Sequence, residues 1–216
     1  TPCRVLLSST GRMVRVELNP EAPDGGIVAP ARRSKHDALR SAVDTSTRGD
    51  LGAITSLGRL IRFSPVDLPS VPGNSVQLAA GTRVDQYLGL SKTEHVVAIV
   101  PIQDSPSIAI GTAQGVVKRV LTSEIAGKPD IEIIALKTGD AVVGAAVAPD
   151  DAELVFITTD AQLLRFAAEA VRPQGRAASG MAGVRISDGA KALYFGVVSA
   201  DAAEPVVVTV ATSSTA

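Results

Sequence analysis

The fold of this chain follows from one segment, Ala109-Ile110-Gly111-Thr112-Ala113-Gln114-Gly115-Val116-Val117-Lys118-Arg119-Val120. An apolar run enters a small polar turn, and a second apolar run follows with Arg119 four residues after Gly115. Apolar β-branched residues favour extended chain, and Gly at a turn position with positive φ reverses the chain direction. The segment therefore predicts a β-hairpin.

The same pattern occurs four times, in residues 5–16, 53–63, 109–120 and 155–166, and a fifth copy begins at residues 206–210. Gly occupies the same turn position in the first three copies, and Ala161 replaces it in the fourth. We expect Asp160 to adopt the left-handed conformation in that fourth turn. The repeated arginines recur at intervals of roughly fifty residues, a period typical of four-stranded propeller blades. They are Arg15, Arg62, Arg119 and Arg165.

Further strands are predicted between the hairpins, and turn signals such as Thr138-Gly139-Asp140 separate them. The strand candidates are residues 95–100, 131–136, 141–147, 183–186 and 190–198. Residues 37–43 are predicted to form one or two helical turns. The predicted fold is all-β and propeller-like, in four-stranded units that we call modules. Modules one to four cover residues 1–48, 49–104, 105–149 and 150–201, and residues 202–216 begin an incomplete fifth.

Composition narrows the classes of protein. The 216 residues are 45% hydrophobic with no apolar run of membrane-spanning length, and no signal peptide precedes the first strand. Thr1 in place of an initiator Met indicates a fragment of a longer chain. The single cysteine, Cys3, excludes an internal disulfide framework and fits a reducing compartment. Because the net charge is only −1, binding of a nucleic acid would require a local basic patch. Aromatic residues make up 3% of the chain, which disfavours stacking on the bases of single strands.

Catalytic and metal-binding patterns are absent from the sequence. His36 and His95 lie far apart and lack neighbours at metal-ligand spacing. The acidic run from Asp150 to Glu153 is typical of a solvated turn. Neither a G-x-S-x-G elbow nor a Walker-type glycine loop occurs. We therefore predict no catalytic residue and no metal site in this chain.

Two segments resemble a known family. Gly115-Val116-Val117-Lys118-Arg119-Val120 is similar to the hairpin of the blades in the C-terminal domain of the A subunit of DNA gyrase and topoisomerase IV. Residues 171–186, Val-Arg-Pro-Gln-Gly-Arg-Ala-Ala-Ser-Gly-Met-Ala-Gly-Val-Arg-Ile, resemble that family's Arg-Pro-x-Gly-Arg-x-x-x-Gly-x-x-Gly-hydrophobic-Arg segment at the outer rim. The resemblance covers essentially the whole chain.

The resemblance implies a β-pinwheel, a propeller-like disc whose basic rim bends duplex DNA largely independently of sequence. It implies a parent enzyme that is an ATP-dependent bacterial type IIA topoisomerase, cytoplasmic and nucleoid-associated. Its partners would be DNA, the catalytic core of its own chain and the ATPase B subunit. ATP and Mg are implied for that holoenzyme, and no cofactor for this domain. Tyr87 and Tyr194 lack the Arg-Tyr-Thr setting of the family's DNA-cleaving tyrosine.

A departure from the family pattern bears on the subtype. Gyrase A subunits carry a motif close to Gln-Arg-Arg-Gly-Gly-Lys-Gly in the first blade. The corresponding residues 31–40 read Ala-Arg-Arg-Ser-Lys-His-Asp-Ala-Leu-Arg, without the double Gly. This favours a topoisomerase IV-like domain, which serves relaxation and decatenation. A supercoiling gyrase domain remains the alternative.

Candidate DNA contacts are basic residues in two segments, residues 32–48 and 165–185, and in the hairpins. Arg suits phosphate because its planar fork donates two parallel hydrogen bonds. The candidates are Arg32, Arg33, Lys35, Arg40, Arg48, Arg59, Arg62, Lys118, Arg119, Arg165, Arg172, Arg176 and Arg185.

Two kinds of alternative stand beside this assignment. Each hairpin arginine could instead pack its stem and pair with a carboxylate, and the loops could be merely solvated. From other classes, a propeller-like protein-interaction scaffold would lack the Trp of WD40 repeats, since the chain has no Trp. A propeller hydrolase would need a polar constellation at the central channel, which the sequence does not display.

Overall fold

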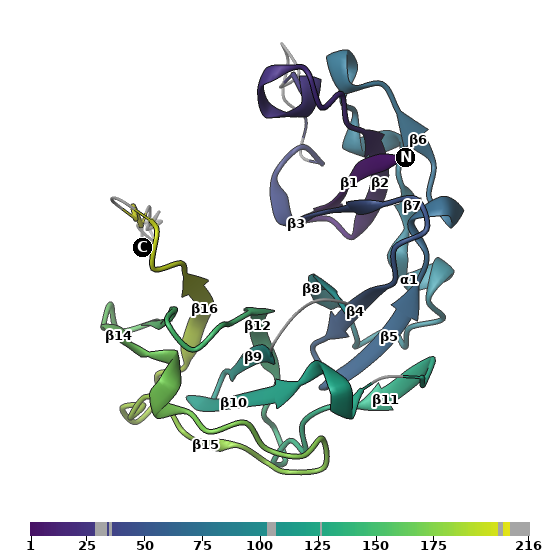
Figure 1. The fold of residues 1–216 in the computed structure, drawn as a ribbon. Coiled ribbons are helices and arrows are strands. Elements are labelled where there is room, and N and C mark those ends of the chain that lie inside the picture. Colours follow the sequence, from purple (N-terminus) through teal and green to yellow (C-terminus); the bar gives the residue numbers. More distant parts are fainter. Residues whose placement is uncertain (29–33, 35, 103–106, 126, 203–204, 208–216) are drawn as a thin grey trace, which may run out of the picture.

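Four small antiparallel sheets follow one another around a ring (Figure 1). The computed structural model describes residues 1–28, 34, 36–102, 107–125, 127–202 and 205–207. Each sheet is built on one of the four predicted hairpins, which are therefore confirmed. The hairpin strands are β1 (Pro2–Ser8) and β2 (Arg12–Glu17), β4 (Leu51–Thr55) and β5 (Arg59–Phe63), β9 (Ser107–Thr112) and β10 (Val116–Leu121), and β13 (Glu153–Thr158) and β14 (Leu163–Ala167).

A third strand in each sheet lies toward the centre of the ring (Figure 1). These inner strands are β3 (Leu39–Ser46), β8 (Val96–Pro101), β12 (Val142–Val147) and β16 (Ala192–Val198). The helical turns predicted for residues 37–43 are wrong, because residues 39–46 pair with β1 along its whole length. The alternation of exposed and half-buried side chains along β3 is the two-residue period of a strand.

The outer strands come from the following module. β6 (Ser70–Val71) and β7 (Thr82–Arg83) pair with β2, β11 (Asp130–Glu132) pairs with β5, and β15 (Met181–Ala182) pairs with β10. Each of the first three sheets is thus completed by residues of the next module, which interlocks the modules. Within the described residues no strand covers the outer edge of β14, and its first residue, Leu163, is 54% exposed. Most of the predicted fifth hairpin lies outside the described residues.

The hydrophobic core is divided among the junctions between neighbouring sheets. Ile54, Leu60, Ile108 and Ile110 pack between the second and third sheets, and each is fully buried. Burying such a side chain contributes about 1.5–3 kcal/mol. Similar clusters join the first sheet to the second and the third to the fourth. The sheets therefore form a rigid frame for the outer segments.

The hairpin turns follow the predicted chemistry with one correction. The glycines at the repeated turn position have φ of 74°, 78° and 80°. In the fourth turn Ala161 takes this conformation, with φ of 61°, so the prediction that Asp160 would do so is wrong. The Asp160 carboxylate instead accepts hydrogen bonds from the Thr158 hydroxyl and the Gln162 amide. Asp160 fixes the turn through its side chain, and the backbone reversal falls one residue later. A short 3₁₀ turn (Ala168–Ala170) and a one-turn helix α1 (Val84–Tyr87) are among the few helical elements.

Candidate nucleic-acid interface

Residues 172–186, which we call the rim loop, lie along the outer edge of the third sheet (Figure 1). The Gln174 N–H donates to the Arg119 carbonyl at 2.8 Å, and the Gly183 N–H donates to the Gly115 carbonyl at 2.9 Å. The Ala135 N–H donates to the Ala178 carbonyl at 3.2 Å. The rim loop is therefore bonded both to the third hairpin and to the segment that follows β11.

Two glycines allow this close approach. Gly180 has φ of 83°, and a Cβ atom there would lie 2.7 Å from the Val117 carbonyl oxygen. A Cβ atom on Gly183 would lie 2.8 Å from the Phe156 ring. Since real Cβ contacts are longer, any side chain at either position would lift the rim loop from β10.

Three arginines of the rim loop are available to a ligand. Arg172, Arg176 and Arg185 are exposed. Among the described residues none of their guanidinium groups has a carboxylate partner or a hydrogen-bond acceptor. A rigid segment thus presents three positive charges that are not neutralised locally.

The hairpin arginines are paired instead. Arg62 bonds to Asp50 and Arg165 bonds to Glu153, while Arg15 lies 4.0 Å from Glu17. Arg59 bonds to Asp130 at 2.5 Å and to the buried Glu94 at 2.8 Å. Hydrogen bonding to Asp130 raises the pKa of Arg59. The structure therefore favours the structural interpretation for these four residues, because each would have to leave a carboxylate to bind phosphate. These four paired arginines are Arg15, Arg59, Arg62 and Arg165.

Comparison with known proteins agrees with this architecture. A family model described as the DNA gyrase C-terminal domain, β-propeller, matches residues 106–149 and 152–199, the third and fourth modules. The DNA gyrase A subunit of Mycobacterium tuberculosis (strain CDC 1551 / Oshkosh) is 31% identical over 151 residues, which are 67% of this chain and 18% of that protein. The chain belongs to this family. The resemblance noted in residues 115–120 and 171–186 is thereby confirmed.

Relatives and solved structures extend the match to most of the chain. The DNA gyrase A subunit of Mycolicibacterium smegmatis (strain ATCC 700084 / mc(2)155) is 28% identical over 207 residues, which are 91% of this chain and 24% of that protein. The chain therefore spans about a quarter of the length of the curated relative it matches. A C-terminal domain of DNA topoisomerase IV has a TM-score of 0.73 at 20% identity, covering 92% of this chain and 62% of that one. A DNA gyrase A C-terminal domain has a TM-score of 0.61 at 17% identity, covering 90% and 64%. These structures share the fold.

Lys118 and Arg119 are buried in this gyrase-type domain. Lys118 is fully buried, and its ammonium donates to the carbonyls of Ile133, Arg176 and Ala178 at 2.7, 2.7 and 2.9 Å. Arg119 is 2% exposed, and its guanidinium donates to the Ala168 carbonyl and to Asp150. Their assignment as phosphate contacts is wrong, because their donors are used inside the protein.

These two buried cations instead hold the rim loop. Their side chains leave opposite faces of β10, and each bonds to carbonyls near one end of the segment from residue 168 to 178. Burial lowers the pKa of Lys118 to about 8, while Glu132 opposes that change. The three carbonyl dipoles also favour the ammonium form, so Lys118 is charged at neutral pH. Both residues are positioning residues for the free arginines of the rim loop.

The other basic candidates divide into two groups. Arg40 and Arg48 are exposed and have no carboxylate partner among the described residues. Arg32, Arg33 and Lys35 lie outside the described residues. One signal for the burial of Lys118 was present in the sequence, since the equivalent positions of the first and second hairpins hold Val14 and Ile61. A position that is apolar in its repeats is expected to face the core.

Tyr87 has a structural partner. The Tyr87 hydroxyl donates to Asp67 at 3.0 Å, and burial together with this bond raises the pKa of Tyr87 to about 12. In the part of the chain that the structure describes, no group of three His, Cys, Asp or Glu side chains could hold a metal ion. Its helices are all too short to cross a membrane.

Proposed function

We propose that this chain is a non-catalytic DNA-binding module that holds duplex DNA by its phosphates and bends it around the outer edge of the ring. The observation that carries this proposal is the rim loop, where three exposed arginines without carboxylate partners are held on a rigid backbone. Arginine binds phosphate through two parallel hydrogen bonds, so a fixed row of such groups suits a DNA backbone. No aromatic platform is required for this mode of binding.

Binding is expected to be electrostatic and largely independent of sequence. The net charge of −1 gives no general attraction for DNA, so the local patch must supply it. Preference for bent or crossed DNA would come from the energy of deforming the duplex. Neutralising roughly six phosphates predicts a slope of log affinity against log salt near −5, at about 0.9 per phosphate.

The parent protein is proposed to be an ATP-dependent type IIA topoisomerase of the bacterial cytoplasm, associated with the nucleoid. Its catalytic core and ATPase B subunit would use ATP and Mg, and this module would position the duplex for strand passage. The topoisomerase IV subtype is supported by residues 31–40, which lack the double Gly of the gyrase motif. The name of the relative, a DNA gyrase A subunit, supports the supercoiling alternative.

The salt dependence of DNA binding tests the proposal. A variant with Arg172, Arg176 and Arg185 changed to Ala should lose about three phosphate contacts, which moves the slope from near −5 to about −3. The matched control changes three exposed lysines, Lys92, Lys137 and Lys191, to Ala. Fluorescence anisotropy with one random-sequence duplex at several salt concentrations measures both slopes. An unchanged slope in the arginine variant, or an equal change in the control, would exclude the rim loop from the DNA path.

A plasmid assay separates the two subtypes. Relaxed plasmid is incubated with the chain, treated with a nicking-closing enzyme and then freed of protein. Chiral wrapping of the gyrase kind leaves a shift in linking number of one sign. The topoisomerase IV interpretation predicts no such shift at a concentration where anisotropy shows saturation.

A further inference from the structure

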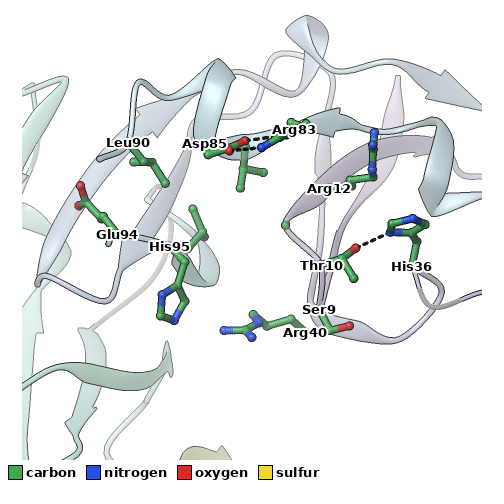
Figure 2. A pocket seen from close by; sticks show the side chains of 13 residues that line it. Ser9, Thr10, Arg12, His36, Arg40, Arg83, Asp85, Leu90, Glu94 and His95 are labelled. Atoms are coloured by element: carbon green, nitrogen blue, oxygen red, sulfur yellow. Dashed lines mark hydrogen bonds and ion pairs between the residues drawn. The ribbon is translucent and has the colours of Figure 1, made fainter. Parts of the chain in front are cut away.

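A pocket of about 410 Å³ lies where the first sheet meets the second (Figure 2). Its walls are the turn between β1 and β2, the residues around the start of β3, the segment from β7 to α1, and the residues around the start of β8. We call it the junction pocket. The polar side chains that matter here are Thr10, Arg12, His36, Arg40, Arg83 and His95.

The corresponding space is filled at the next two junctions. A Cβ atom on Gly58 would lie 2.7 Å from the Ile134 side chain, and one on Gly115 would lie 2.4 Å from the Val184 carbonyl oxygen. A Cβ atom on Gly11 meets nothing closer than Val84 at 3.5 Å. The first junction is therefore open where the others are packed by the outer segment of the next module.

The junction pocket carries positive charge that the protein does not neutralise. Arg83 is paired with Asp85 at 2.6 Å, and Glu94 is held by Arg59 at 2.8 Å. Figure 2 shows the Glu94 carboxylate pointing away from the pocket centre, where the Arg40 guanidinium and the His95 ring point toward each other. Among the described residues, neither Arg12 nor Arg40 has a carboxylate partner. The pocket is thus built for an anion.

A chain of hydrogen bonds fixes the His36 ring in the wall of the pocket. The buried Ser8 hydroxyl accepts from the Arg12 backbone N–H at 3.0 Å and shares a hydrogen bond with the Thr10 hydroxyl at 2.9 Å. The Thr10 hydroxyl in turn shares a hydrogen bond with His36 Nδ1 at 2.7 Å. The ring is thus held through Nδ1, and among the described residues its Nε2 has no hydrogen-bond partner.

His95 reports on the charge of the pocket. Burial, and then the positive charge of Arg40, lower the pKa of the His95 imidazole. An anion between Arg40 and His95 would remove their repulsion and favour the imidazolium form. Anion binding is therefore coupled to proton uptake by His95. The other charged or titratable groups around His95 are Glu94 with its partner Arg59, Arg12, the Arg83–Asp85 pair and His36.

We propose that the junction pocket binds a phosphate group between the Arg40 guanidinium and the His95 ring, which point toward each other in Figure 2. The phosphate can belong to a DNA backbone, in which case the inference rests on the proposed function, or to a free phosphorylated solute. The pocket exceeds the size of one phosphate, so a ligand that carries further atoms beside the phosphate fits it.

Nuclear magnetic resonance of the two histidines tests the proposal directly. The chain has only His36 and His95, so two imidazole signals report the site without further assignment. Pyrophosphate is titrated into the 216-residue chain at constant ionic strength, adjusted with sodium chloride. Both signals should shift with saturation, and the pKa of His95 should rise by about one unit in the complex. Signals that do not move, or that move linearly without saturation, would overturn the proposal.

A pair of variants separates a site from general charge. Arg40→Gln should weaken pyrophosphate binding about tenfold, the loss of one charge-assisted hydrogen-bond donor. Arg172→Gln removes the same charge from the exposed rim loop and should leave the affinity within about twofold. Equal losses in the two variants would mean that the histidines sense only a diffuse positive field.

A second titration identifies the source of the phosphate. A short DNA duplex that shifts the same two signals, and whose effect pyrophosphate competes away, would assign the site to the DNA backbone. Duplex that binds by anisotropy without moving these signals would leave the pocket to a free phosphorylated solute. Failure of duplex to bind at all would refute the proposed function, while saturation by pyrophosphate would still support the pocket.

Discussion

Replacing Lys118 with Met is the sharpest test of how the rim loop is held. Met has a similar length and no charge, so the change removes the ammonium with little change in packing. Three carbonyls, those of Ile133, Arg176 and Ala178, lose their donor. Two of these carbonyls belong to the rim loop, which carries the free arginines.

The magnitude follows from two opposing terms. Each bond from the ammonium contributes about 1.5–3 kcal/mol, so three contribute about 4 to 5 kcal/mol at the lower end. The lower end applies because the rim loop is exposed and its carbonyls can turn to water. The lowered pKa of Lys118, about 8 against the usual 10.5, corresponds to about 3 to 4 kcal/mol for burying the charge. Lys118→Met should therefore cost only about 1 kcal/mol of unfolding free energy while releasing the rim loop locally.

Three measurements on Lys118→Met decide the matter. Urea denaturation measures the loss of unfolding free energy, and hydrogen exchange of residues 174–182 measures how far the rim loop is released from β10. The dependence of DNA affinity on salt measures the effect on binding. Exchange should rise by at least about tenfold in the rim loop, and DNA affinity should fall although no exposed charge is removed. The matched control, Lys137→Met, removes an exposed lysine and should change neither. Rim-loop exchange and DNA affinity equal to those of the control would refute the positioning role.

Three further predictions concern stability. The pKa of Lys118 in the folded state lies below its value in the unfolded state, so the unfolded state binds more protons between about pH 8 and pH 10.5. The unfolding free energy of the wild type, relative to that of Lys118→Met, should therefore rise with pH across that window. Urea titrations at several pH values measure it. Ala161→Gly should stabilise the domain by about 0.5–1 kcal/mol, because Ala161 has φ of 61°, which Gly adopts without strain. The control, Ala113→Gly, is at a turn position without positive φ and should not stabilise the domain. Thermal unfolding compares the two variants. Gly183→Ala should cost about 1–3 kcal/mol because its Cβ would meet an aromatic ring at 2.8 Å, and Gly175→Ala, with nothing within 4 Å, should be neutral by the same measurement.

The hairpins were predictable because their signals are local. An apolar β-branched run, a turn residue with positive φ and a second run lie within a dozen residues, and four copies reinforce one another. The outer strands were not predictable as partners, because β11 and β15 have only three and two residues and pair with the preceding module. β3 was missed because its alternating pattern was interpreted as short helical turns.

The candidate site was also predictable only in part. The motif in residues 171–186 indicated the rim loop, and its three arginines are exposed. The sequence could not distinguish Arg119 from Arg172, since only the fold brings the carbonyls of Ala168 and Val171 to the Arg119 guanidinium. The junction pocket likewise joins residues such as Arg12 and His95 that lie far apart along the chain. Such groupings are properties of the assembled ring.

Interlocked modules explain how a chain with almost no net charge can present a basic edge. The hairpin arginines are neutralised by carboxylates, so they bind neighbouring segments and add little to the external field. The rim loop belongs to the fourth module in sequence but lies on the third sheet. Lys118 bonds to its carbonyls, Arg119 bonds to the carbonyls of Ala168 and Val171 just before it, and its own arginines are left free. Lys118 bonds to carbonyls and Arg119 pairs with Asp150, so the cations that hold this region place no carboxylate beside Arg172, Arg176 and Arg185 among the described residues. Some cations are therefore buried and others exposed at the edge because each outer segment pairs with the sheet of the preceding module.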